Sequence, residues 1–130
     1  MYDLLMLLAN ECYFLFRDHN ARIVDSTIVG HFDAAMIALE INDCEFIFAK
    51  EKCCIELLVG PKGASRTHDN YAIGLVRELL TGVQETAVLD SDNIDFLKAY
   101  VTDVIDCFNS KNLEQTRMRI KKLRQSHKSK

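Results

Sequence analysis

From residue 21 onward the apolar residues stop following a helical period and begin to alternate with polar ones, and this change constrains the fold most strongly. A period of two is typical of a β-strand with one buried face. The pattern indicates strands at 23–29, 35–41, 44–49 and 53–59. Because their connections are short, we predict a four-stranded antiparallel meander.

Turn-forming residues separate these strands. Gly30 to Asp33 supplies the first turn, Asn42 and Asp43 the second, and residues 50–52 the third. Residues 60–63 (Gly-Pro-Lys-Gly) end the last strand, because proline cannot donate to a ladder. The same four residues have the pattern of the nucleic-acid clamp of KH domains, but that clamp joins two helices. The strand-like segment before it favours an ordinary turn.

An apolar run at residues 4–9 precedes the strands. It differs from an export signal, because Asp3 stands in place of a basic segment and Asn10 and Glu11 stand where a cleavage site would be. It is also far shorter than the roughly 20 residues that cross a bilayer. The buried side of a first helix explains it better, with these residues at helical spacing: Leu4, Leu5, Leu8, Cys12, Leu15 and Phe16.

Helical periodicity returns after a polar loop at 64–70. One helix begins behind a cap at residues 69–70 and ends at Gly82, where glycine is favoured. Another begins behind a cap at residues 91–92, and the last begins at Leu113. The order of one helix, four strands and three helices predicts the α+β class.

The 130 residues, 48% of them hydrophobic, fit one compact domain without disulfide or metal support. We expect a single domain over residues 1–124 and a basic, frayed tail over residues 125–130. Five cysteines lack the regular spacings of a secreted disulfide scaffold, so we expect reduced thiols in the cytoplasm: Cys12, Cys44, Cys53, Cys54 and Cys107.

The sequence contains no motif that is typical of a particular catalysed reaction. The four histidines are scattered and no cysteine pair has zinc-knuckle spacing, so the sequence predicts neither a metal site nor a cofactor. A thiol nucleophile beside a distant histidine stays open, but buried cysteines acting as small hydrophobic residues explain the pattern better. We therefore predict a protein that is not an enzyme.

Charge is segregated along the chain. Residues 1–110 carry 18 acids and 8 bases, a net charge of −10, whereas residues 111–130 carry one acid and 8 bases, a net charge of +7. An acidic body attracts cationic partners. Residues 69–106 hold eight acids against two bases, and we predict that a partner binds these six: Glu85, Asp90, Asp92, Asp95, Asp103 and Asp106. A merely solvated helix face is the alternative.

The basic segment has two interpretations. Five bases could contact nucleic-acid phosphates: Arg117, Arg119, Lys121, Lys122 and Arg124. The same bases could instead fold back on the acidic body. The opposite sign of the body favours the second interpretation and argues against nucleic acid.

The order of elements, with Gly30-His31-Phe32-Asp33-Ala34 in the meander and the helix Tyr71 to Gly82 after it, resembles small bacterial immunity proteins of contact-dependent growth inhibition and other polymorphic toxin systems. The resemblance covers residues 1–82 and does not include the basic segment. It implies a cytoplasmic antitoxin that neutralises a cognate toxin domain, often a basic nuclease. These families share no binding signature, so the resemblance assigns no site residue.

We therefore expect an inhibitor that blocks the active site of a cationic toxin domain, without a cofactor and without a membrane partner. A nucleic-acid-associated regulator that uses the basic C-terminal helix is the alternative. Whether the chain forms a homo-oligomer stays open.

Overall fold

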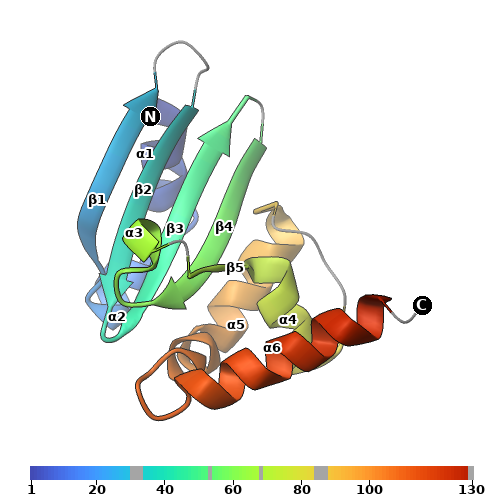
Figure 1. The fold of residues 1–130 in the computed structure, drawn as a ribbon. Helices are drawn as coiled ribbons and strands as arrows, with labels where there is room; N and C mark the ends of the chain where they lie inside the picture. The colour runs from blue at the N-terminus through green and yellow to red at the C-terminus, as the bar shows by residue number, and fades with distance from the viewer. Residues whose placement is uncertain (30–33, 53, 68, 84–87, 129–130) are drawn as a thin grey trace.

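The computed structural model describes residues 1–29, 34–52, 54–67, 69–83 and 88–128 (Figure 1). The α+β class and the antiparallel meander are confirmed. The elements in chain order are α1 (Tyr2–Asn10), α2 (Phe14–His19), β1 (Arg22–Val29), β2 (Ala34–Ile41), β3 (Cys44–Glu51), β4 (Cys54–Pro61), α3 (Ala64–Thr67), β5 (Tyr71–Ala72), α4 (Ile73–Thr81), α5 (Ser91–Cys107) and α6 (Leu113–Lys128).

The sheet has five strands in the order β1-β2-β3-β4-β5, and all neighbours are antiparallel. The fifth strand was not predicted, because two residues are too few to show a period. Its Ala72 pairs with Leu58 of β4. The amide of Leu89 donates to the carbonyl of Ile55, so a second short segment also lies along β4. At the turns, Asn42 and Lys52 have positive φ angles, and Gly30 to Asp33 lie outside the described residues.

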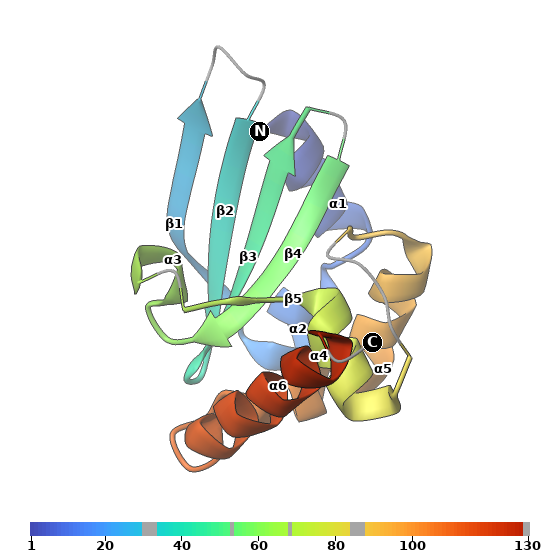
Figure 2. The ribbon, with the colours of Figure 1, turned by 45° about the vertical axis from the view of Figure 1, so that its right-hand side comes forward.

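Helices cover one face of the sheet. Figures 1 and 2 show α1 behind the strands, whereas α4, α5 and α6 gather beyond β4 and β5. Cross-strand partners on the helix side form the centre of the core, because Leu39, Phe46 and Val59 pair across three strands and are 0% exposed. On the other face, Ala64 of the short α3 packs with Ala38 and Ile47.

The predicted first helix is two helices. Helix α1 buries Leu4 and Leu8, and a turn at residues 11–13 separates it from α2, which buries Leu15. Leu4, Leu8, Cys12 and Leu15 are buried at the predicted spacing, although the helix is interrupted between them. Leu5, expected on the buried side, is 49% exposed.

Two predicted caps are wrong. Helix α4 begins directly after β5 with Ala72 at its N-cap, so residues 69–70 do not cap it. The N-cap of α5 is Asp90, one residue before the predicted cap at 91–92. Gly82 does end α4, with a φ angle of 79°. The predicted polar loop at 64–70 contains α3.

Gly60 explains why the last long strand ends in a glycine-containing segment. A Cβ atom at this position would lie 2.3 Å from the carbonyl oxygen of Asp69 and 2.7 Å from the Cβ of Ala64. Only glycine lets the chain after α3 return so close to β4.

Helix α6 continues to Lys128, where the sequence predicted a frayed tail from residue 125. Of the helices in the described part of the chain, none has both the length and the apolar character that crossing a bilayer requires.

Candidate functional site

Helix α5 presents the predicted acidic residues. Its apolar side is buried in the core through residues that include Ile94, Leu97 and Val104. The opposite side leaves four aspartates exposed to solvent: Asp92, Asp95, Asp103 and Asp106. Glu85, the first of the six predicted residues, lies outside the described residues. The structure therefore places four of the six predicted residues on the exposed side of one helix.

Asp90 has a structural task instead. Its carboxylate accepts a hydrogen bond from the Asn93 backbone amide at 2.9 Å, which satisfies one of the free donors at the start of α5. A carboxylate used in this way is less available to a partner. Asp90 is exposed like the four aspartates of α5, but it also caps the helix.

Asn93 fixes the start of α5 to the rest of the fold. Its side chain is fully buried, donates to the carbonyl of Val88 at 2.7 Å and accepts from the guanidinium of Arg77 at 3.3 Å. The same guanidinium lies 5.9 Å from the ring centroid of Phe96. These contacts join α4 to α5 and hold the acidic face on a fixed element.

The four exposed carboxylates form two pairs. Asp92 and Asp95 are three residues apart, as are Asp103 and Asp106, and this spacing makes them neighbours on a helix surface. Tyr100, with φ −119° and ψ 15°, kinks the helix between the pairs. Within the described part of the chain, none of the four makes an ion pair. Like charges at this spacing destabilise a helix slightly.

The second pair borders a hollow of about 240 Å³ that α6 closes from the other side with Arg119. The Arg119 guanidinium donates to the carbonyl of Leu79 at 3.4 Å. The hollow mixes both signs, whereas the pair near the start of α5 faces solvent.

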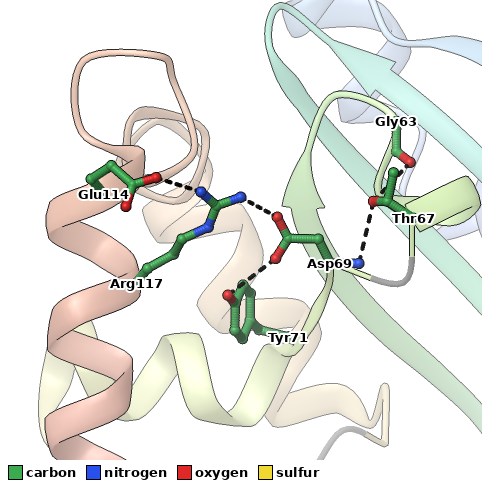
Figure 3. Close-up of polar contacts among 6 residues, drawn as sticks. All are labelled: Gly63, Thr67, Asp69, Tyr71, Glu114 and Arg117. Atoms are coloured by element: carbon green, nitrogen blue, oxygen red, sulfur yellow. Dashed lines mark hydrogen bonds and ion pairs between the residues drawn. The ribbon is translucent and has the colours of Figure 1, made fainter.

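The basic helix folds back on the body, as the charge pattern favoured. Figure 3 shows Arg117 of α6 between Glu114 on its own helix and Asp69, which precedes β5. Asp69 also accepts a hydrogen bond from the Tyr71 hydroxyl at 3.1 Å. These hydrogen bonds to carboxylates raise the pKa of the Arg117 guanidinium. Burial and the nearby Asp69 carboxylate raise the pKa of Tyr71.

A second contact fixes the far end of α6. His127 Nε2 lies 2.7 Å from each carboxylate oxygen of Glu78 on α4. Only 8% of the Glu78 side chain is exposed, so the histidine covers a nearly buried carboxylate. This contact explains why the helix continues past residue 125.

The five basic residues predicted for nucleic acid do not share one environment. Arg117 is held by two carboxylates and Arg119 faces the acidic hollow. Lys121 and Arg124 line a different hollow on the other flank of α6, and Lys122 is exposed. Sequence reasoning missed Tyr71 and Lys128, which line that hollow with them. The spacing of the bases along the helix was the available signal.

Three of the cysteines are buried: Cys12, Cys44 and Cys107. Burial raises the pKa of the Cys12 thiol to about 12 and also raises the pKa of Cys44 and Cys107. A raised pKa disfavours the thiolate, which is the reactive form. Cys54 is exposed, and Cys53 lies outside the described residues.

Comparison with protein-family models finds no match. Comparisons with curated proteins and with solved structures find no significant match either.

Proposed function

We propose that the protein is an inhibitor of the immunity type, which binds a cationic toxin domain through the exposed carboxylates of α5 and blocks its active site. The observation that supports this function is the set of four exposed aspartates without an ion pair in the described part of the chain. They offer a rigid, strongly acidic surface to a positively charged partner.

Folding gives little reason for two of these carboxylates. Asp103 and Asp106 lie in the C-terminal half of α5, where the helix dipole disfavours negative charge. Each aspartate also has a like-charged neighbour three residues away. Asp103 and Asp106 thus occupy an exposed face on an anchored element without stabilising the helix, which fits a binding role better than a structural one.

Affinity capture with the tagged protein from its native cells, followed by mass spectrometry, identifies the partner. We expect a basic protein with a toxic domain. The decisive variant reverses three of the aspartates to lysine: Asp92→Lys, Asp95→Lys and Asp106→Lys. Because these positions lie off the apolar side of α5, the variant should fold. Its association rate with the partner should fall at least about tenfold at low salt, and the difference should narrow as salt rises.

A matched control carries the same change in net charge elsewhere on the surface: Glu11→Lys, Asp43→Lys and Glu51→Lys. These three positions are exposed and lie on other elements. The control should keep most of the association rate if the location of the charge decides recognition. Equal rates for the parent and the α5 variant, or equal losses for both variants, would contradict the proposal.

A further inference from the structure

A groove of about 330 Å³ runs between Tyr71 of β5 and one flank of α6. Among the described residues, four basic side chains and no acidic one line it: Arg117, Lys121, Arg124 and Lys128. Their spacing of four, three and four residues places them in one row along the helix. Other hollows combine both signs, such as the one where Arg22, Lys62 and Arg66 meet Glu40 and Glu45.

Three of the four cations are available to a ligand. Arg117 is bound by Asp69 and Glu114, whereas Lys121, Arg124 and Lys128 form no ion pair with the residues that the structure describes. The rise of the helix separates Lys121 from Lys128 by about 10 Å. This row of charges suits an extended polyanion better than a single small anion.

The groove also has an aromatic wall with a fixed orientation. The ring of Tyr71 stacks on Phe108 with 5.9 Å between centroids, and the Tyr71 hydroxyl donates a hydrogen bond to Asp69. The guanidinium of Arg124 lies 5.4 Å from the centroid of the Tyr71 ring. Nucleic-acid strands are bound in grooves that combine backbone-tracking cations with aromatic rings and stacked arginines.

Helix α6 itself separates this groove from the acidic surface. Its Arg119 flank faces Asp103 and Asp106, and its other flank, with Lys121 and Arg124, faces Tyr71. The acidic charge of the body is therefore not distributed evenly around the helix. The acidic charge on the α5 side would repel phosphate, whereas this groove is lined by basic residues.

We infer that the groove between β5 and α6 binds a single nucleic-acid strand, with its phosphates on Lys121, Arg124 and Lys128. A concave surface with one aromatic wall fits a flexible single strand better than a rigid duplex. An acidic polypeptide would supply charge but no base to stack on the Arg124 guanidinium that lies over the Tyr71 ring. This site is independent of the acidic face of α5.

Fluorescence anisotropy of the whole protein with a labelled oligothymidylate of about 20 nucleotides tests the inference. The variant carrying Lys121→Glu and Lys128→Glu should bind at least about tenfold more weakly at low salt. The parent should show a salt dependence of about −2 on a log–log scale, as expected for three phosphate contacts on a single strand, and the variant should show a smaller one.

The matched control carries Lys111→Glu and Lys122→Glu, which change the net charge equally at exposed positions outside the groove. It should keep affinity within about threefold of the parent. Neutral replacements, Lys121→Gln and Lys128→Gln, provide a second groove variant, and thermal unfolding of every variant shows that it folds.

Several results would overturn the inference. One is failure of the oligonucleotide to bind the parent protein, and another is equal weakening of its binding by the groove variant and the control variant with reversed charges. The others are tighter binding of a duplex of the same length than of the single strand, and competition by polyglutamate equal to that by an unlabelled oligonucleotide. The last result would assign the groove to an acidic protein. Because these lysine variants leave α5 unchanged, failure here leaves the proposed inhibitor function standing, and the reverse also holds.

Discussion

Arg117 on α6 forms an ion pair with Asp69, 48 residues earlier, and so fastens the last helix to the segment that leads into β5 (Figure 3). Asp69 also accepts a hydrogen bond from the Tyr71 hydroxyl. The pair therefore positions both sides of the basic groove, and it connects the basic end of the sequence to its acidic body.

Replacing either partner should destabilise the fold modestly. Both side chains are partly exposed, 36% for Arg117 and 26% for Asp69, so solvent screens the pair. We expect Arg117→Ala and Asp69→Ala to couple in a double-mutant cycle by roughly 0.5–1 kcal/mol in urea unfolding. The coupling should shrink in high salt. Simple additivity of the two losses at low salt would contradict the ion pair.

The end of α6 gives a second prediction. Truncation after residue 124 removes His127, which contacts and covers the Glu78 carboxylate. Because water can then reach this carboxylate, we expect a loss of roughly 0.5–1.5 kcal/mol in the free energy of unfolding. Truncation after residue 128 keeps the contact and serves as the control. The sequence predicted a frayed tail over residues 125–130, so equal stability of the two truncations would agree with that prediction and contradict a stabilising contact.

These two contacts show where sequence reasoning stops. Alternation and helical spacing predicted the four long strands and the starts of the last helices within a few residues. Opposite charge predicted that the basic helix folds back. The partners themselves could not be predicted, because Asp69 and Glu78 carry no local signal that distinguishes them from other acids. Tyr71 likewise has no sequence signal that distinguishes it from other aromatic residues, because its role depends on α6 lying beside it.

The same limit applies to the acidic site. Composition identified residues 69–106 as acidic, but not that Asp90 caps α5 while Asp92 and Asp95 make no such hydrogen bond in the described part of the chain. A shift of one residue in a helix start changes which carboxylate meets the backbone amides. Sequence patterns seldom fix helix ends that closely.

The buried thiols predict a loss of stability in alkali. Burial raises the pKa of Cys12 from 9.0 to about 12, so the folded protein keeps a proton that the unfolded chain releases near pH 9. The stabilisation is complete below pH 9 and is lost as the pH rises from 9 towards 12. Urea unfolding between these pH values should show the decline, and Cys12→Ala should make it shallower. An unchanged slope in the variant would exclude Cys12 as a cause.

Thiol labelling provides an independent measurement of the same burial. In the native protein at neutral pH, Cys54 should react much faster than Cys12, Cys44 and Cys107, because it is exposed and they are buried. After unfolding without reductant, all five cysteines should react, as expected for a protein from a reducing compartment. Disulfides trapped in freshly purified protein would contradict that expectation.

The last prediction separates carboxylates that build α5 from those proposed to bind a partner. Asp90 accepts from the Asn93 amide, so Asp90→Ala should lower the free energy of unfolding by about 1 kcal/mol, whereas Asp90→Asn should retain most of it because asparagine is an equally good N-cap. Asp95 is exposed and makes no ion pair among the described residues, so Asp95→Ala and Asp95→Asn should both leave stability within about 0.5 kcal/mol.

In binding measurements we expect the opposite order, with larger effects for the Asp95 variants than for Asp90→Asn. Both Asp95 variants should slow association with the captured partner by a similar factor, since each removes the same charge from the exposed face. Asp90→Asn also removes one charge, yet its effect should be smaller because that carboxylate is directed to the helix backbone. Asp95 variants that destabilise the protein and bind normally would place this residue in the fold rather than in the site.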